Sequence, residues 1–402
     1  MTHLAQDSLA TIYFEFFWKS SHASHVERYL ASRVRFTGDT LPLGVKSHMR
    51  GLGAGDSIEI TMDSSEVPEL SDGKVLDMPL ARFKAPFIHG RAIRPRIGRY
   101  YPMHLIEDVP GTRPDSNAPF RVVEADKAGF KADLNHPMAG RDVTIRARVV
   151  DIHPQSDDPG KTVRWADRFF NGPGMQARLP ETPTDYLGAD PFLREDETGD
   201  ADFYENARLV AHLDRQAQQN VRNVYSGVLE NGMDVLDLMS SHISHLPSEL
   251  TFDSVTGLGL NQTELDANPA LTDTVLHNLN EKPTLPFDDE SFDAIICTSS
   301  VEYLTRPFEV FEEAARVLRP GGVFALTFST RWFEPKVIRI WPELHEFERM
   351  GLVSQFFVRS DKFDDLHTLS ERGWPRLPDD EDRYYPELAE SDPVYAVWGR
   401  KK

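Results

Sequence analysis

The 402-residue chain has a single cysteine, Cys297. One cysteine supports neither a disulfide framework nor a cluster of thiolate metal ligands, so small disulfide-rich folds and cysteine zinc sites are excluded. No run of about 18 apolar residues is present, which argues against a membrane-spanning helix. The opening residues, MTHLAQDSLATIYFEFFWKS, lack the basic start and apolar stretch of a secretory signal. We therefore expect a cytoplasmic protein.

Basic residues are scarce in only one part of the sequence. The chain has 44 Lys and Arg against 64 Asp and Glu, a net charge of −20. Residues 1–155 hold 20 basic and 19 acidic side chains, whereas residues 156–402 hold 24 and 45. This change predicts a domain boundary near residue 155. It also argues against nucleic acid as a partner of the acidic part, because phosphate binding requires a basic surface.

The N-terminal part has the composition of a β domain. Runs of β-branched and aromatic residues predict strands at 9–18, 57–62 and 143–151. Residues 156–205 are rich in Pro, Gly and Asp and are expected to form a linker. This linker contains apolar residues that indicate partial packing: Phe169, Phe170, Met175 and Phe192.

The C-terminal part alternates strand and helix patterns. Short apolar runs predict strands at 233–238, 255–260, 292–298 and 323–328. Apolar residues at helical spacing predict helices at 205–227 and 307–318. Such alternation implies a parallel sheet with helices on both faces. The run VYAVW (394–398) is expected to close the sheet as an edge strand.

Two long segments carry a family resemblance. LPFDDESFDAIICTSSVEYL (285–304) and EVFEEAARVLRPGGVFALTFSTRWF (309–333) resemble the fourth to sixth motifs of class I S-adenosylmethionine (SAM)-dependent methyltransferases. The resemblance covers about 206–402 and implies a Rossmann-like sheet with SAM as cofactor. The combination LDLMSS, GLGLN, LNEKPTLPF and YLTRPFEVF is similar to a type 11-like subfamily with a Ser-rich first motif.

The resemblance implies that the loop after 233–238 holds the amino-acid end of the cofactor. Ligands bind parallel sheets at the carboxyl ends of the strands. Asp237 is expected to orient the cofactor's amino group or a water; alternatively, it caps the loop. Met239, Ser240 and Ser241 stand where the family usually has glycines. The two serines are expected to bind the methionine carboxylate, or else to form the turn.

The ribose and adenine contacts depart from the family pattern. The acid that usually holds the ribose hydroxyls aligns with Gly259, so Asn261 or Glu264 is expected to replace it. Asn278 and Leu279 fall where an acid usually reads the adenine amine. The Asn278 carbonyl oxygen can still accept a hydrogen bond from that amine.

Ser299 and Ser300 close the fourth strand beside the sulfonium centre and are expected to bind the cofactor. Methyl transfer requires a nucleophile about 3 Å from the methyl carbon in a water-poor pocket. Candidate catalytic groups are His212, His242, His245 and Tyr303, and candidate substrate contacts are Tyr204 and Arg208. Tyr204, Arg208 and His212 are placed on the helix before the first motif. The spacing of His242 and His245 can also serve a metal, but without further ligands we predict none.

The N-terminal part resembles a second family. ADLNHPMAGRDVTIRARVVDI (132–152) and GLGAGDSIEI (51–60) are similar to the SlyD-like branch of FKBP-type prolyl isomerases. The resemblance covers about 8–152 and implies a β domain with an inserted flap at about 84–135.

The isomerase pocket implied by this resemblance is incomplete. Pro42 stands where a backbone N–H should meet the peptide carbonyl, and proline has none. Val45 and Val67 replace pocket aromatics, Phe14 replaces a tyrosine, and Glu27 replaces the pocket acid. We therefore expect no prolyl isomerase activity.

The inserted flap carries four closely spaced arginines, Arg91, Arg94, Arg96 and Arg99. They are suited to an anionic peptide or RNA, or to docking on the acidic domain of the same chain. Charge complementarity favours intramolecular docking.

Together these observations predict a two-domain SAM-dependent methyltransferase: residues 1–155, a linker at 156–205, and residues 206–402. The predicted acceptor is a small molecule, and a small thiol or sulfide is favoured because no strong general base stands out. The alternatives are a protein or peptide methyltransferase guided by the FKBP-like domain, and a chaperone-like binding protein with a degenerate methyltransferase domain. The sequence indicates no oligomeric state.

Overall fold

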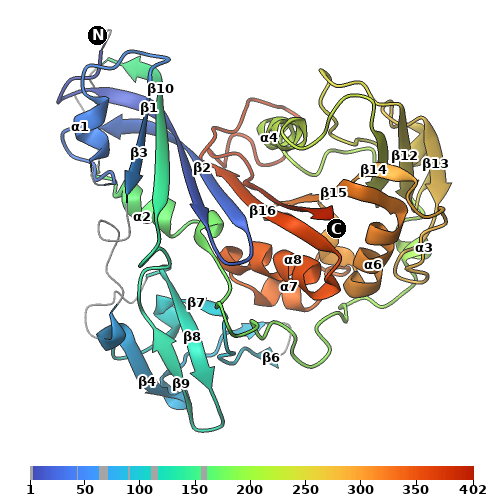
Figure 1. The fold of residues 1–402 in the computed structure, drawn as a ribbon, viewed down its shortest axis with the longest axis horizontal. Helices are drawn as coiled ribbons and strands as arrows, with labels where there is room; N and C mark the ends of the chain where they lie inside the picture. Colours follow the sequence, from blue (N-terminus) through green and yellow to red (C-terminus); the bar gives the residue numbers. More distant parts are fainter. Residues whose placement is uncertain (1–2, 43, 63–70, 89–90, 110–115, 155–160) are drawn as a thin grey trace. The chain divides into compact units, whose positions relative to one another are not determined.

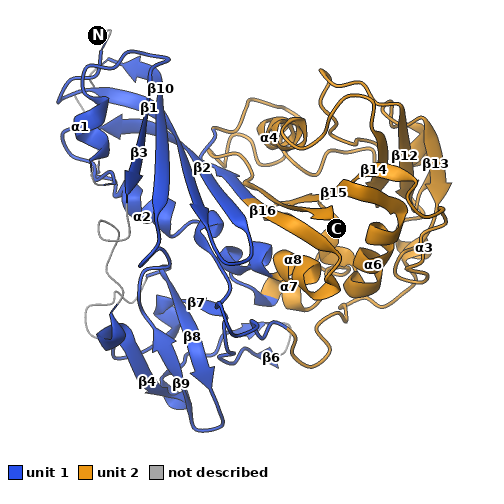
Figure 2. Ribbon diagram, viewed as in Figure 1, with its two compact units in different colours: residues 1–186, 343–351, 369–374 blue, residues 187–342, 352–368, 375–402 orange. Residues whose placement is uncertain are grey.

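The computed structural model describes residues 3–42, 44–62, 71–88, 91–109, 116–154 and 161–402. The chain forms two compact units (Figure 2). Unit 1 comprises residues 1–186, 343–351 and 369–374, and unit 2 comprises 187–342, 352–368 and 375–402. Unit 1 therefore extends beyond the boundary predicted near residue 155. It also includes two segments from the acidic part of the sequence.

The main sheet of unit 1 is antiparallel and confirms the three predicted strands (Figure 1). The order is β2 (Ser24–Arg35), β1 (Leu9–Lys19), β10 (Val143–His153) and β3 (Ser57–Met62). Along β1, Ile12, Phe14 and Phe16 are fully buried because alternate side chains of a strand share a face. The short helix α1 (Val45–Met49) precedes β3.

A separate sheet is inserted between β3 and β10 in the chain. Its order is β4 (Val75–Pro79), β9 (Gly129–Asp133), β8 (Pro119–Ala125) and β7 (Tyr100–Pro102). β5 (Phe87–Ile88) and β6 (Arg91–Ala92) form a small hairpin. The insertion has its own core, which includes Phe120 and Phe130. It begins at or before Val75, earlier than the predicted residue 84.

The segment after β10 covers one face of the main sheet. Phe169 of α2 (Trp165–Phe170) lies 4.7 Å from Phe14 between ring centroids. The backbone N–H of Gly174 donates to the Glu27 carboxylate at 2.8 Å, and Arg372 pairs with the same carboxylate at 2.6 Å. Phe14 and Glu27, predicted to line an isomerase pocket, are thus in contact with this segment. In the described part of the predicted linker, Trp165, Phe169, Phe170 and Met175 are buried, whereas residues 180–183 are exposed.

The flap arginines have different surroundings. Arg96 pairs with Asp185 at 2.5 Å. Arg99 is buried and pairs with Glu348 of the segment 343–351, which belongs to the same unit. Docking of the flap on the acidic domain stays a prediction, and Val67 lies outside the described residues.

Unit 2 contains the predicted parallel sheet (Figure 1). In sheet order, the parallel strands are β13 (Asp273–Leu276), β12 (Ser254–Gly259), β11 (Asp234–Leu238), β14 (Phe292–Thr298) and β15 (Leu318–Phe328). β17 (Val394–Lys401) pairs with β15 in the antiparallel direction. The predicted edge position of β17 is wrong, because β16 (Phe363–Arg372) follows it in the sheet.

The helices of unit 2 correct one prediction that concerns the site. The helix expected over 205–227 begins only at α4 (Arg215–Ser226), so Tyr204, Arg208 and His212 lie in irregular chain. The helix starts there because the Asp214 side chain accepts hydrogen bonds from the first turn, a strong N-terminal cap. The other helices are α3 (Asp200–Phe203), α5 (Gln262–Asp266), α6 (Pro307–Val317), α7 (Ile340–Glu343) and α8 (Glu346–Ser360), the last two shared with unit 1.

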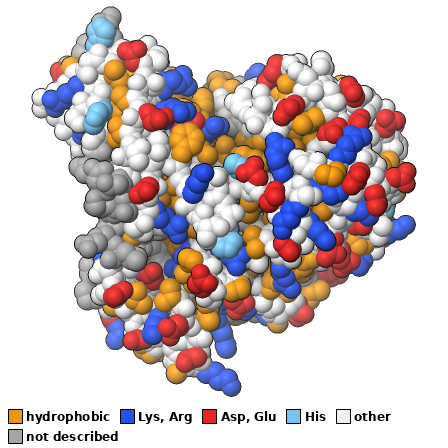
Figure 3. Space-filling view, in the orientation of Figure 1, with side chains coloured by type: hydrophobic (Ala, Val, Ile, Leu, Met, Phe, Trp, Pro, Cys, Tyr) orange, Lys and Arg blue, Asp and Glu red, His pale blue; other side chains and the backbone are white. Residues whose placement is uncertain are grey.

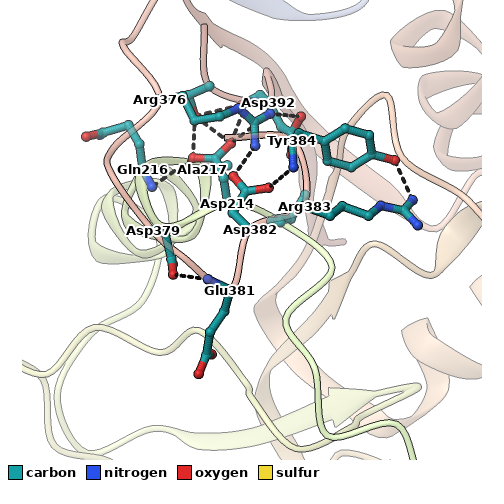
Figure 4. A network of polar contacts seen from close by, with 12 residues as sticks. Asp214, Gln216, Ala217, Arg376, Asp379, Glu381, Asp382, Arg383, Tyr384 and Asp392 are labelled. Carbon is teal, nitrogen blue, oxygen red and sulfur yellow. Dashed lines mark hydrogen bonds and ion pairs between the residues drawn. The ribbon is translucent and has the colours of Figure 1, made fainter. Parts of the chain in front are cut away.

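Asp214 is also fixed by tertiary contacts (Figure 4). Its carboxylate accepts hydrogen bonds from Ser391 and from the backbone N–H of Asp392. Arg376 lies 3.6 Å from Asp214 and pairs with Asp382 and Asp392. This network joins the start of α4 to the chain before β17, and so holds the irregular segment that ends at Asp214.

The helices and the surface charge bear on two of the sequence predictions. None of the helices described is long and apolar enough to cross a membrane. On the face of the molecule that Figure 3 shows, acidic and basic side chains are intermixed over unit 2, so its excess acidic charge is not gathered into one patch there.

Candidate functional site

A cavity in unit 2 lies at the carboxyl ends of β11, β12 and β14. Every site residue predicted from the sequence lines it, although their individual roles stay predictions. These residues are Tyr204, Arg208, His212, Asp237, Met239, Ser240, Ser241, His242, His245, Asn261, Glu264, Asn278, Leu279, Ser299, Ser300 and Tyr303. The irregular chain around 194–213 forms one wall, and the strand-end loops form the others.

Asp237 is a buried carboxylate near the end of β11. Its Oδ2 accepts hydrogen bonds from Ser240 and Ser244, each at 2.6 Å. Burial raises its pKa to about 6, and these two hydrogen bonds oppose the increase. The bonds fit the alternative in which Asp237 caps its loop. At neutral pH the Asp237 carboxylate is a buried negative charge, and it lies beside the space where a cationic amine is expected.

The two serines of the first loop donate to carboxylates of the protein. The Ser240 hydroxyl is bonded to Asp237, and the Ser241 hydroxyl donates to Glu264 at 2.6 Å. This arrangement fits the turn-forming alternative for both residues. It also connects the loop after β11 to α5, which follows β12.

Three residues of the cavity adopt left-handed backbone conformations without being glycine. The φ angles of Met239, His245 and Ser299 are 59°, 54° and 47°. Met239 and Ser299 directly follow β11 and β14, where the chain turns away from the sheet. Non-glycine residues in this region carry backbone strain, which is often found at ligand sites. The methionine therefore occupies a conformation that a glycine adopts more easily.

This strain predicts an inverted order of stability for two variants of Met239. At an ordinary position alanine is more stable than glycine by about 0.4–1 kcal/mol. At position 239 we expect Met239→Gly to be more stable than Met239→Ala by about 1 kcal/mol, because only glycine adopts a positive φ without cost. Thermal unfolding of the two variants measures this difference. A Met239→Ala variant equal to or more stable than Met239→Gly contradicts it.

The packing around Gly259 leaves no room for a side chain at the position where related methyltransferases have a ribose-binding acid. A Cβ atom at this position would lie 2.4 Å from the Ser240 carbonyl oxygen and 3.1 Å from Leu265 Cδ2. The loop after β11 thus packs directly on the end of β12, and the Ser240 N–H donates to the Leu258 carbonyl at 2.8 Å. No side chain fits at residue 259 unless this loop moves.

Of the two predicted replacements, Glu264 has the better geometry. The Asn261 carbonyl oxygen caps α5 by accepting from the Glu264 N–H, and its amide nitrogen donates to the carbonyls of Tyr204 and Glu205. All three of these bonds are structural. Glu264 accepts one bond at each oxygen, from Ser241 and from the Arg208 N–H, and a carboxylate can accept more. Glu264 is therefore the better candidate for the ribose hydroxyls.

Asn278 presents a different group from the one predicted. Its carbonyl oxygen accepts a hydrogen bond from the Asn280 N–H at 3.0 Å. Among the residues described, no group accepts from its buried amide nitrogen. The side chain therefore offers a donor suited to a ring nitrogen, besides the remaining lone pair of its carbonyl oxygen.

Burial shifts the pKa of three histidines and of Tyr303 in the cavity toward the neutral form. Burial is the main factor that lowers the pKa of His245 to about 3, and it also lowers the pKa of His242 and His212. Burial raises the pKa of Tyr303 well above its ordinary value, and the Tyr303 hydroxyl accepts from the Phe333 N–H at 2.8 Å. None of these residues is a strong base at neutral pH.

Sequence reasoning missed several residues that complete the cavity wall. Asp200 pairs with Arg194 and accepts a hydrogen bond from Asn280 at 2.8 Å. Asn280 also donates to the Tyr303 carbonyl, which joins the 194–200 segment to the loops after β13 and β14. Phe333 follows β15 and lines the cavity. No local pattern marks these residues, because their contacts lie far apart in the sequence.

Several buried polar atoms of the cavity are free to meet a ligand such as SAM. Besides Asn278, buried polar atoms of His245, Ser299 and Arg208 have no hydrogen-bond partner in the described chain. Such atoms are costly unless a ligand or water meets them. The buried carboxylate of Asp237 suits a cationic amine, and the Asn278 amide suits a purine edge. The residues present therefore fit the cofactor, which supplies an electrophilic methyl group when it is bound.

A family model agrees with this geometry. The model described as a methyltransferase domain matches residues 239–326, from the loop after β11 to β15. Residues 239–326 are therefore similar to methyltransferase domains. The match and the names of its relatives support a SAM-dependent enzyme with SAM as the cofactor.

The chain aligns with less than a third of the length of each of two curated relatives. The chain is 44% identical over 50 residues to the biotin biosynthesis bifunctional protein BioHC of Teredinibacter turnerae, covering 12% of this chain and 9% of that protein. It is 28% identical over 104 residues to the mitochondrial 2-methoxy-6-polyprenyl-1,4-benzoquinol methylase of the mouse, covering 26% and 32%. A solved SAM-dependent methyltransferase of Thermotoga maritima shares 13% identity over 47% of this chain and 91% of its own. Its TM-score of 0.34 is too low to support an argument about function.

Proposed function

We propose that this protein transfers a methyl group from SAM to a small-molecule acceptor. The observation that carries the proposal is the cavity at the strand ends. There, a buried carboxylate, Asp237, and unpartnered donors such as Asn278 Nδ2 line the same space, and the residues that match the methyltransferase model begin two positions after Asp237. The mouse relative is named as a methylase of a quinol, a small molecule.

The acceptor that best suits the cavity is a thiol or sulfide. Thiols ionise near pH 8.5, so a useful fraction is thiolate at neutral pH without a strong base. A sulfide requires no deprotonation. The lowered pKa values of His212, His242 and His245 make these residues weak bases. They are better suited to holding and desolvating the acceptor than to taking its proton.

Turnover by the purified full-length protein tests the proposal. The protein is incubated with SAM and a panel of thiols, sulfides, amines and phenols, and S-adenosylhomocysteine (SAH) is measured. We expect SAH from at least one thiol or sulfide, at a rate above that of amines and phenols. If SAH does not form from any acceptor, and calorimetry at millimolar concentration detects no SAH binding, the proposed function is wrong.

The titration of Asp237 predicts a pH dependence of cofactor binding. Its pKa of about 6 in the free protein falls when an amine cation binds beside it, so bound ligand and proton compete. Above pH 6 the carboxylate is ionised and contributes fully to binding. Below pH 6 this contribution should be lost, up to about tenfold in affinity per pH unit while the ligand amine stays charged. Calorimetry with SAH at pH 5, 6 and 7.5 measures the change.

Asp237→Asn is the matched control for this titration, because it retains an oxygen that accepts from Ser240 or Ser244. We expect the variant to bind SAH more weakly at pH 7.5 and with little change down to pH 5. A wild-type affinity that is constant over this range, or an equal slope in the variant, would assign the amine to another partner.

We propose further that unit 1 is an FKBP-type domain of the SlyD-like branch. Supporting features are the short helix α1 before β3 and the separate sheet inserted between β3 and β10. Prolyl isomerase activity is not part of the proposal, because Phe169 and Gly174 contact Phe14 and Glu27. In a standard peptide isomerisation assay, unit 1 in the full-length protein should not accelerate the reaction.

A further inference from the structure

Arg208 spans the cavity from one group of loops toward another. Its backbone N–H donates to Glu264, in the helix after β12, at 2.7 Å. Its guanidinium carbon lies 4.5 Å from the ring centroid of Phe203 and 4.9 Å from that of Phe333, which follows β15. Aromatic rings thus flank the charged group, and its Nη1 atom is buried.

The charge of Arg208 has no carboxylate partner within the described chain. The Nη2 atom donates only to the Phe203 carbonyl at 3.5 Å, and Nη1 is buried with no hydrogen-bond partner. Arg194 in the same cavity differs, because it pairs with Asp200. A guanidinium that is flanked by rings and has a buried free donor is well suited to bind an anion, which accepts charge-assisted hydrogen bonds.

The position of the guanidinium separates it from the predicted cofactor contacts. Most of those contacts follow β11, β12 and β13, on one side of β14 in the sheet order, and Ser299 and Ser300 follow β14 itself. Phe333 follows β15, on the other side of β14. The guanidinium stacks on Phe333, near Tyr303, whose hydroxyl accepts from the Phe333 N–H. Arg208 is therefore placed on the acceptor side of the cavity.

We propose that Arg208 binds a carboxylate of the methyl acceptor, so that the acceptor is a small carboxylic acid. This inference rests on the proposed function and specifies its substrate class. The planar guanidinium binds the two carboxylate oxygens in parallel, a geometry that the smaller ammonium of lysine does not reproduce. Combined with the preference for sulfur, the acceptor class is a mercapto or thioether carboxylic acid.

Matched acids and amides test the inference. 3-Mercaptopropionate is compared with 3-mercaptopropanamide, and 4-hydroxybenzoate with 4-hydroxybenzamide, in SAH formation and in calorimetric binding to the SAH-loaded full-length protein. We expect the acid of the sulfur pair to have at least a tenfold higher kcat/KM and at least a tenfold lower Kd than the amide. Since binding is measured separately, the test does not depend on turnover of these compounds.

Arg208→Gln and Arg208→Lys identify the residue responsible. We expect Arg208→Gln to raise KM for the acid about tenfold with little change in kcat, and to leave the amide unaffected. Arg208→Lys should restore only part of the preference. SAH should bind both variants within twofold of the wild type, and thermal unfolding shows whether each variant is folded.

Two results would overturn the inference while leaving the proposed function intact. One is an equal affinity of wild-type protein for acid and amide in both pairs. The other is a loss of SAH affinity in Arg208→Gln that disappears when SAH is replaced by its decarboxylated analogue, S-adenosyl-3-thiopropylamine. That loss would show that the guanidinium holds the cofactor's own carboxylate. Absence of SAH binding to the wild type, in contrast, contradicts the proposed function itself.

Discussion

Gly259→Asp, which restores the acid usual at this position in the methyltransferase family, is expected to abolish cofactor binding instead of improving it. The new Cβ would lie 2.4 Å from the Ser240 carbonyl oxygen, far inside van der Waals contact. The obstacle is backbone and not a flexible side chain, so the loop after β11 must move. That loop carries Met239 and Ser240, and its displacement also breaks the Ser240–Asp237 hydrogen bond. We expect SAH affinity to fall at least about 100-fold, or about 2.7 kcal/mol.

Alanine variants separate the steric effect from the effect of charge. Gly259→Ala adds only the Cβ atom and should lose most of the same affinity. Gly227→Ala is the matched control, because its Cβ would lie 3.5 Å from the nearest atom, an ordinary contact. This control should bind SAH like the wild type. If Gly259→Ala binds SAH normally and only Gly259→Asp fails, the charge and not the packing at residue 259 is responsible.

The sequence predicts those parts of the site in which the local pattern of apolar and polar residues determines the secondary structure. β11, β12, β14 and β15 are apolar runs, and polar loops follow them at the carboxyl ends. Parallel pairing brings those ends together, so the residues of the loops had to share one region. This is why the predicted residues of these loops line one cavity, which Tyr204, Arg208 and His212 join from the chain before β11.

The parts that were predicted wrongly depend on contacts between distant segments. The helical spacing of Leu209, Leu213 and Ala217 predicts a helix over 205–227. Instead, the helix begins after Asp214, whose carboxylate accepts from the Ala217 N–H. Ser391 and Asp392, which are distant in the sequence, donate to this carboxylate and hold it in place. β17 was expected at an edge because β16 (FDDLHTLSER) is too polar to predict as a strand. In both cases the missing information lies in residues more than 20 positions away.

The proposed substrate class also depends on contacts between distant segments, so it can be inferred only from the structure. The sequence shows that Arg208 and Phe333 exist, but not that they stack or that the nearest acids are bonded elsewhere. Glu264 is occupied by Ser241 and the Arg208 N–H, and Asp200 by Arg194 and Asn280. The Arg208 guanidinium is thereby left without a carboxylate partner among the described residues, which is what suggests an anionic acceptor.

Arg99→Met is expected to destabilise unit 1 by about 3–5 kcal/mol, because it leaves the Glu348 carboxylate buried without its counter-ion. Arg99 donates to both oxygens of Glu348, at 3.2 and 2.9 Å, and the side chains are 2% and 0% exposed. Glu348 also accepts from the Tyr100 N–H at 2.9 Å. The pair thus connects the inserted sheet to the segment 343–351, over 240 positions later in the chain. Urea unfolding at pH 7.5 measures the loss.

A double variant distinguishes the effect of a stranded charge from that of lost packing. Arg99→Met with Glu348→Leu removes both charges and should recover most of the stability, since an apolar pair can replace a buried ion pair. If the double variant is as unstable as the sum of the two single variants, the contribution of the ion pair is packing and not charge. The full-length protein is required for these measurements, because segments 343–351 and 369–374 complete unit 1.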